Sequence, residues 1–238
     1  MNKPMSSVPY RCAVYFAPPP DSEWGQAGRD WLGRCALTGK AQAQPRIEGI
    51  DAHAQLAYTA EPRRYGWHAT LKAPFTLQPG QDLYSVACWL KLLASRHRAF
   101  MLPPLRVQRM GDFLALQPEA DSAALQCLAD DCVMRLQHLA LPLDTSELAR
   151  RRRAPLSPAQ EALLEKWGYP WVLNEFRFHF SLTGSLKDVS AADCACWLAA
   201  AKQHFEVLPP CPVDRLSLFV EPIKGADFVL HEQIGLSA

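Results

Sequence analysis

The stretch YGWHATLKAPF, residues 65 to 75, places three polar side chains at alternate positions: His68, Thr70 and Lys72. Most of its other residues are apolar, so the pattern predicts a β-strand, in which successive side chains face opposite ways. One side of this strand would carry an imidazole, a hydroxyl and an ammonium. An imidazole can take up or release a proton near neutral pH, and the hydroxyl and the ammonium can bind a negatively charged group.

A second strand repeats this arrangement in NEFRFHFSLTGSL, residues 174 to 186. Its strict alternation predicts an apolar face formed by Phe176, Phe178, Phe180 and Leu182. The opposite face would carry Arg177, His179, Ser181 and Thr183. Each histidine is therefore followed, two residues later, by a hydroxyl on the same face.

The two motifs belong to a longer internal repeat. HAT at 68 matches HFS at 179, ACWL at 87 matches ACWL at 195, and LPP at 102 matches LPP at 208. Landmarks that recur in the same order indicate a duplicated unit. Two units related by a pseudo-two-fold axis would place their histidine strands side by side, with both imidazoles facing one cleft.

Two imidazoles in one cleft suit acid–base catalysis at phosphorus. One can take a proton from an attacking nucleophile while the other gives a proton to the leaving oxygen. We assign His179 as the base and His68 as the acid, although the pseudo-symmetry leaves the reverse assignment open. Thr70 and Ser181 would donate hydrogen bonds to the non-bridging phosphoryl oxygens. This mechanism needs neither a metal ion nor a cofactor.

Other polar residues extend the two faces, and each has a structural alternative. We expect substrate binding by Lys72, Arg177, Thr183 and Tyr15. The alternative places Lys72 and Arg177 at solvated strand ends and Tyr15 in the core. For the two histidines themselves, the alternative is a hydrogen-bonded role inside the sheet.

The paired motifs His68-Ala69-Thr70-Leu71 and His179-Phe180-Ser181-Leu182 resemble those of the two-histidine (2H) phosphoesterase superfamily. This superfamily includes 2′–5′ RNA ligases and cyclic nucleotide phosphodiesterases. The longer stretches are similar to one bacterial branch, which is encoded beside phosphonate-degradation (C–P lyase) genes. Those stretches are RCAVYFAPP, RYGWHATLKAPF, ELARRRR and LSPAQEALLEKWGYPWVLNEFRFHFSLTG.

The resemblance implies a bilobal, pseudo-two-fold α+β fold, in which antiparallel sheets line a central cleft and helices lie outside. Residues 1–238 would form a single bilobal domain. The histidine motifs would occupy about 64–118 and 174–236, and a helical segment at about 119–170 would connect them.

The resemblance also implies a cyclic phosphodiesterase that acts without a metal. Its genomic setting suggests a ribose cyclic phosphate of phosphonate catabolism as the substrate. A 2′–5′ RNA ligase or RNA 2′,3′-cyclic phosphodiesterase is the first alternative. A non-catalytic phosphometabolite-binding protein is the second.

The bulk composition favours a small phosphorylated substrate over RNA. The chain has 238 residues, of which 49% are hydrophobic and 21% charged, as in ordinary globular domains. Its net charge of +1 provides no general attraction for a polyanion. The run Arg150 to Arg153 is either a solvated segment or a local guide for a phosphorylated substrate.

The sequence also predicts a cytoplasmic protein that does not contact a membrane. Its first residues lack a signal-peptide core, and no stretch approaches the roughly 20 apolar residues of a membrane span. The eight cysteines are scattered, which favours buried, reduced thiols over a zinc site.

Apolar periodicity predicts the elements that must position the two motifs. We expect further strands at 11–17, 99–109, 112–117, 213–220 and 227–235. We expect helices at 22–36, 82–95, 121–140 and 191–204, and one that begins at Ser157 with a capping box and ends near 168. The segment 38–63 is expected to be a loop with one short helix, and the sequence does not decide whether it covers the cleft.

Overall fold

The computed structural model describes residues 8–152 and 155–237, and its central feature is one antiparallel sheet of seven strands. The strand order β4-β5-β6-β2-β1-β8-β9 makes the two motif strands, β2 and β6, neighbours. The α+β class is confirmed, and the two lobes share a continuous sheet. The strands are β1 (Arg11–Phe16), β2 (Ala69–Phe75), β4 (Leu105–Met110), β5 (Phe113–Pro118), β6 (Phe180–Ser181), β8 (Arg215–Glu221) and β9 (Val229–Gly235). A separate two-stranded pairing joins β3 (Phe100–Met101) and β7 (Pro212–Val213).

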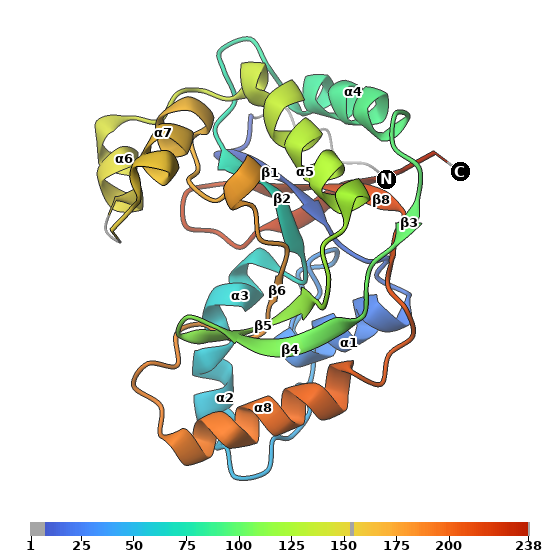
Figure 1. Cartoon of the computed structure of the whole chain (residues 1–238), viewed down its shortest axis with the longest axis vertical. Coiled ribbons are helices and arrows are strands. Elements are labelled where there is room, and N and C mark those ends of the chain that lie inside the picture. Colours follow the sequence, from blue (N-terminus) through green and yellow to red (C-terminus); the bar gives the residue numbers. More distant parts are fainter. Residues whose placement is uncertain (1–7, 153–154, 238) are drawn as a thin grey trace.

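Helices cover the sheet in two groups (Figure 1). Helices α4 (Leu83–Ala94) and α5 (Ala123–Arg135) pack on β2, β8 and β9, whereas α8 (Ala191–Phe205) packs on β4. The remaining helices are α1 (Glu23–Leu32), α2 (Ala52–Tyr58), α3 (Ala60–Tyr65), α6 (Thr145–Arg151) and α7 (Pro158–Trp167). Short 3₁₀ turns occur at Gln137–Leu139 and Leu173–Glu175.

Most of these helices begin at a short polar side chain that accepts a hydrogen bond from a backbone N–H of the first turn. These N-caps are Ser22, Asp51, Asp82, Ser122, Asp144, Ser157 and Ser190. The capping box expected at Ser157 is confirmed, since Gln160 Oε1 accepts a hydrogen bond from the Ser157 backbone N–H. The cap at Asp144 begins α6, a helix that the sequence analysis did not anticipate.

The two halves of the chain run through the same elements in the same order. The first half runs β2-α4-β3-β4-β5 and the second runs β6-α8-β7-β8-β9. The hairpin that ends each half pairs with a strand of the other half. The hairpin β4–β5 pairs with β6, whereas β8–β9 pairs with β1, which lies beside β2. Strands β3 and β7 pair where the two connections cross.

Several details differ from the expected elements. The strand expected at 65–75 begins only at Ala69, because Tyr65 belongs to α3, and the strand expected at 99–109 divides into β3 and β4. The LPP match is not structurally equivalent, because LPP at 102 follows β3 whereas LPP at 208 precedes β7. The segment 38–63 leads into two helices, α2 and α3, rather than one. The expected strand at 174–183 forms ladder bonds only at Phe180–Ser181, although Phe178, Phe180 and Leu182 are buried as the alternation predicts.

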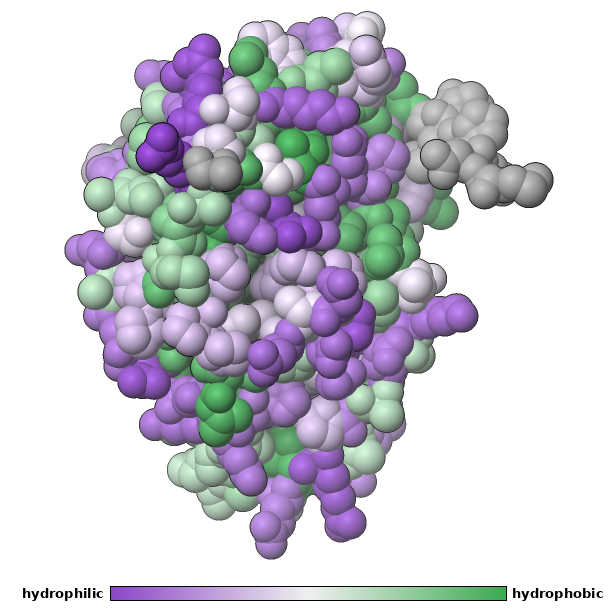
Figure 2. Space-filling view, turned by 90° about the vertical axis from the view of Figure 1, so that its right-hand side faces the viewer, coloured by the Kyte–Doolittle hydropathy of each residue, from purple (hydrophilic) through white to green (hydrophobic). Residues whose placement is uncertain are grey.

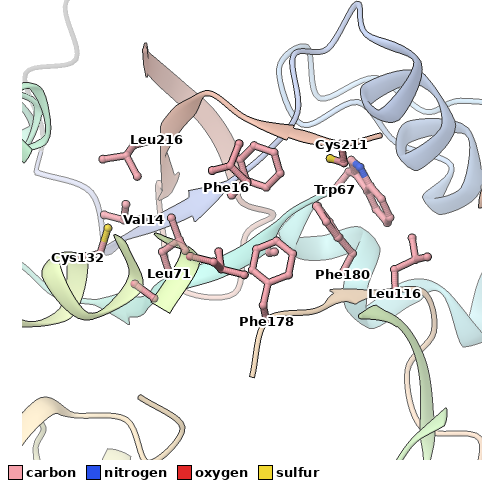
Figure 3. Packing of buried hydrophobic residues seen from close by; sticks show 14 of the residues in the cluster. Val14, Phe16, Trp67, Leu71, Leu116, Cys132, Phe178, Phe180, Cys211 and Leu216 are labelled. Atoms are coloured by element: carbon pink, nitrogen blue, oxygen red, sulfur yellow. The ribbon is translucent and has the colours of Figure 1, made fainter. Parts of the chain in front are cut away.

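An aromatic stack joins the two motif strands on the face of the sheet opposite the imidazoles. Trp67, which precedes His68, stacks on Phe180, which follows His179, with ring centroids 4.6 Å apart. Trp67 also stacks on Phe205 of α8, with ring centroids 5.2 Å apart. Figure 3 shows Trp67 and Phe180 within the buried hydrophobic cluster. Gly28 of α1 lies against this indole, and a Cβ there would come within 2.0 Å of it. The apolar positions of the two motifs therefore hold the imidazoles in place on the opposite face.

The surface includes few large apolar areas on the side shown in Figure 2, where hydrophilic residues predominate and small hydrophobic patches are scattered. Within residues 8–152 and 155–237, no helix has the length and apolar character needed to cross a bilayer. All eight cysteines lie in this described part of the chain, and all are free thiols.

Candidate active site

The register of β2 and β6 brings the two motifs together. Ala69 lies opposite Phe180 in an antiparallel pair, so His68 faces Ser181 and Thr70 faces His179 across the strands. Each imidazole is thus paired with the hydroxyl of the other motif. The two histidines occupy diagonal positions, and residues at diagonal positions of antiparallel sheets are about 7–8 Å apart along the backbone. Both imidazoles line the same cavity.

Each imidazole is oriented by a backbone carbonyl two residues earlier. His68 Nδ1 lies 2.8 Å from the carbonyl oxygen of Gly66, and His179 Nδ1 lies 2.7 Å from that of Arg177. A carbonyl only accepts hydrogen bonds, so Nδ1 carries a proton in both rings. Nε2 is then the ring nitrogen that can accept a proton in each histidine. The Thr70 hydroxyl, 3.3 Å away, donates to Nε2 of neutral His68.

The turn before His68 depends on a glycine. Gly66 has a φ of 81°, in the region that favours glycine, and a Cβ there would lie 2.7 Å from the Cβ of Ala36. This conformation ends α3 and directs the Gly66 carbonyl to the imidazole. The glycine therefore sets the protonation pattern of His68 through the backbone.

Burial in the site favours the neutral form of both histidines. Burial lowers the pKa of His68 to about 4; the Gly66 carbonyl opposes this shift, and the nearby His179 adds to it. Burial likewise lowers the pKa of His179. Tyr15 stacks on His68 at 3.8 Å, and burial keeps the pKa of its hydroxyl well above the ordinary value. An anion placed between the rings would raise both histidine pKa values.

Six of the eight expected site residues line one open cavity of about 560 Å³: His68, Thr70, His179, Ser181, Thr183 and Tyr15. Thr183 is buried, and its hydroxyl accepts a hydrogen bond from the backbone N–H of Leu114. Tyr15 is also part of the core, because only 1% of its surface is exposed. The roles of these residues in catalysis and binding remain predictions.

Lys72 does not reach this cavity, and the expected alternation is wrong at that position. Tyr15 pairs with Thr70 but Val14 pairs with Lys72, so β2 contains one extra residue between these pairs. This irregularity turns the Lys72 side chain to the opposite face of the sheet. There its ammonium donates to Gln137 Oε1 at 2.8 Å and to the Val133 carbonyl at 3.4 Å.

Arg177 is also outside the side chains that line the cavity. Its guanidinium lies over the ring of Trp171, 5.1 Å from the centroid. The chain does not form ladder bonds at Arg177, because β6 begins only at Phe180. The residue contributes its carbonyl, which orients His179, rather than its charge.

The cavity also contains groups that the sequence analysis did not assign to it, among them Arg11, Tyr65 and Tyr169. Period-two alternation from Tyr15 would have placed Arg11 on the same face of β1. Arg150 and Arg151 line the cavity as well, which supports the guiding role considered for the basic run. Arg152 instead pairs with Glu161 and Glu165, and Arg153 lies outside the described residues.

The buried Lys72 ammonium leads to a prediction about stability. Burial lowers its pKa from 10.5 to about 8, and the nearest titratable groups are the thiols of Cys12 and Cys132. Lys72→Met should raise the free energy of unfolding at pH 7 by about 1–3 kcal/mol, because a desolvated charge is removed. Between pH 8 and 10.5 the unfolded chain binds the proton that the folded chain has lost, so only the parental chain gains stability. The difference between the two should therefore shrink.

Urea unfolding at pH 7 and pH 10, under reducing conditions, measures this difference. The control is Lys91→Met, since the Lys91 side chain is 60% exposed, and it should change stability by less than about 0.5 kcal/mol at either pH. A Lys72→Met chain that is less stable than the parent at pH 7 would contradict the prediction.

The described residues contain no group of three or more His, Cys, Asp or Glu side chains arranged to hold a metal ion.

Comparison with known proteins defines the family of the chain. Residues 70–229 match the family described as "Protein of unknown function (DUF1045)", and the chain belongs to this family. It is 39% identical over 230 residues to a protein of Janthinobacterium sp. (strain Marseille) named ribose 1,5-bisphosphate phosphokinase PhnN. It is 40% identical over 226 residues to a protein of the same name from Laribacter hongkongensis (strain HLHK9). Each match covers 95% of the chain, but the chain spans about half the length of these curated relatives, 51% and 52%.

The solved structures that match this one have low sequence identity to the chain. E. coli LigT complexed with NADP⁺ gives a TM-score of 0.46 at 14% identity, covering 98% of this chain and 100% of LigT. A structure described as a phosphoesterase gives a TM-score of 0.45 at 14% identity, covering 97% of this chain and 100% of its own.

Proposed function

We propose that this chain hydrolyses a small cyclic phosphate diester by acid–base catalysis with its two histidines. The observation that carries the proposal is the antiparallel pairing of the two motifs. It leaves Nε2 of His68 and of His179 as the proton-exchanging atoms and sets each ring opposite a hydroxyl of the other motif. Two groups that exchange protons from either side suit an in-line displacement at phosphorus.

The steps follow from these positions. The phosphoryl group lies between the imidazoles, and Thr70 and Ser181 donate hydrogen bonds to its non-bridging oxygens. His179 Nε2 takes a proton from the attacking water, whose oxygen bonds to phosphorus. The ester bond to the leaving oxygen breaks, and His68 Nε2 gives that oxygen a proton. The product is a phosphate monoester with one new hydroxyl.

Burial lowers the pKa of both histidines in the same direction, so the choice of His68 as acid and His179 as base is our assignment and does not follow from the pKa values. The pKa of free His68 is about 4, so its protonated form is a strong acid. The negative charge of the substrate would favour protonation of His68 at neutral pH. Once the leaving oxygen departs, the burial that lowers the pKa assists proton release. His179, whose pKa is also lowered, is neutral and ready to act as a base.

A ribose cyclic phosphate is the substrate that we favour. The two relatives are named for an enzyme that acts on ribose 1,5-bisphosphate, and a phosphorylated ribose is therefore a reasonable ligand class. The resemblance of the sequence to a phosphonate-associated branch of two-histidine phosphoesterases points the same way. The net charge of +1 favours a small substrate over RNA.

A panel of substrates tests the proposal. The purified chain is incubated with ribose cyclic phosphates, with 2′,3′-cyclic nucleotides and with 2′–5′-linked dinucleotides, and products are identified by phosphorus NMR. We expect ring opening of the ribose compounds to a monoester, unchanged by EDTA. Preferred turnover of the nucleotide substrates would favour an RNA-directed enzyme. Tight binding without turnover would favour a binding protein, and inhibition by EDTA that added metal reverses would contradict the mechanism.

A further inference from the structure

The cavity that contains the histidines extends to a cluster of cationic and phenolic groups, which we call the arginine end: Arg11, Arg151, Tyr65 and Tyr169. On β1, Arg11 is four residues from Tyr15 on the same face, about 13 Å along the strand. Tyr15 stacks on His68. On β2, Ala73 and Pro74 line the cavity beyond Thr70. The cavity therefore runs along the sheet from the imidazoles to the arginines.

Aromatic rings connect the two ends of the cavity. The Tyr65 ring lies 6.1 Å from the His68 ring and stacks on Phe228 at 5.0 Å. The guanidinium of Arg11 lies over the same Phe228 ring at 5.8 Å, and that of Arg64 lies over it at 5.7 Å. The Tyr65 and Phe228 rings thus lie between the imidazole of His68 and the guanidinium groups of Arg11 and Arg64.

Positive charge at the arginine end exceeds its negative charge. Glu221 is fully buried and forms ion pairs with both Arg11, at 2.6 Å, and Arg64. Two guanidinium groups share this single carboxylate, which leaves one positive charge unbalanced. Because Glu221 fixes Arg11 in place, its remaining N–H donors are pre-oriented for a ligand.

Arg151 adds a second cation whose donors are largely unused within the described structure. Its Nη2 lies 3.4 Å from the Pro74 carbonyl oxygen. Its buried Nε has no hydrogen-bond partner among the described residues. The neighbouring acid, Glu147, pairs with Arg150 instead. The guanidinium lies over the Tyr169 ring at 5.5 Å. Burial raises the pKa of Tyr169, so its hydroxyl stays protonated and can donate.

We propose that the arginine end binds a second phosphate group of the substrate, a terminal monoester distinct from the cyclic diester that reacts. This inference rests on the proposed function. A monoester dianion matches two guanidinium groups and a phenolic donor better than an uncharged hydroxyl does. The sugar would lie between the two phosphates, against Tyr65 and Pro74. The substrate class is then a sugar cyclic phosphate that carries a terminal phosphate, and the product is a sugar bisphosphate.

The test compares two ribose cyclic phosphates that differ only at carbon 5, where one has a hydroxyl and the other a phosphate. The ratio of their kcat/KM values is measured for the parental chain, for Arg151→Met and for Arg152→Met. We expect the parent to prefer the phosphorylated compound by at least about tenfold, since charge-assisted hydrogen bonds are roughly twice as strong as neutral ones. Arg151→Met should lower this ratio by about tenfold or more. Arg152→Met removes the adjacent arginine, which pairs with Glu161 and Glu165, and should keep the parental ratio.

A parental chain without preference for the phosphorylated compound would overturn the second phosphate site while leaving the proposed function intact. An Arg151→Met ratio equal to that of the parent would also overturn the second phosphate site and leave the proposed function intact. If neither compound is hydrolysed, the proposed function fails, and calorimetric titration with ribose 5-phosphate and with ribose tests the site separately. Binding of ribose 5-phosphate that weakens about tenfold in Arg151→Met, but not in Arg152→Met, would uphold the site, and absence of binding would overturn it.

Discussion

Replacing either His68 or His179 with alanine is expected to slow cyclic phosphate hydrolysis by about two to four powers of ten. Each substitution removes the Nε2 atom that exchanges a proton with one end of the reacting group. The two imidazoles act on the same transition state, so the rate of the double variant should be only slightly below that of the slower single variant. Steady-state rates with the preferred substrate of the panel measure these effects.

The matched control is His53→Ala, because His53 is exposed in the first turn of α2, away from the cavity. It should keep the parental rate. Circular dichroism and thermal unfolding confirm that the site variants fold, which matters because His68 also stacks on Tyr15. If both His68→Ala and His179→Ala hydrolyse substrate at the parental rate, the two-histidine mechanism is wrong.

Glu221→Gln is expected to lower the free energy of unfolding by about 3–5 kcal/mol. The Glu221 side chain is 0% exposed, and the side chain of its partner Arg11 is 11% exposed. Its carboxylate also accepts a hydrogen bond from the Gly225 backbone at 2.7 Å, which holds the turn after β8. The substitution leaves two guanidinium groups of a partly buried cluster without a counter-charge. The desolvation cost of those groups is then no longer offset.

Glu119→Gln provides the comparison, because its ion pair with Arg106 joins two side chains that are 43% and 44% exposed. Because both side chains are solvated, this pair should contribute little to the free energy of unfolding. Urea unfolding of both variants and the parent, at pH 7 without phosphate, gives the two differences. If Glu221→Gln and Glu119→Gln lower the free energy of unfolding equally, burial does not make the Glu221 ion pairs more stabilising than an exposed pair.

Local sequence patterns predicted which side chains of the motifs share a face, because each pattern reports on its own segment, although β2 begins only at Ala69 and β6 spans only Phe180–Ser181. Alternation placed His68 and Thr70 on one face, and the doubling of the motif placed His179 beside them. Alternation failed at Lys72, where one extra residue in β2 reverses the direction of the side chain. That irregularity depends on how β1 pairs with β2, which the residues of β2 alone do not specify.

The arginine end was anticipated only through the basic run that contains Arg151, because its other members come from separate parts of the chain. Arg11 lies on β1, Arg151 ends α6 and Tyr169 follows α7. Helix α6 itself was missed, although Asp144 caps it and Glu147 pairs with Arg150 three residues later. Its seven residues include only one large apolar side chain, Leu148, so periodicity gives no signal there.

The exchange of hairpins between the two halves has a consequence for folding. Strand β6 depends on β5 of the first half, and β1 depends on β8, which lies about 200 residues further along the chain. Neither half contains all the strands that its own histidine motif needs. We therefore expect the sheet to close late, after most of the chain has been synthesised, and to form slowly because its contacts are so distant in sequence. A partly folded chain would lack the paired imidazoles altogether, so that only completely assembled molecules could act on substrate.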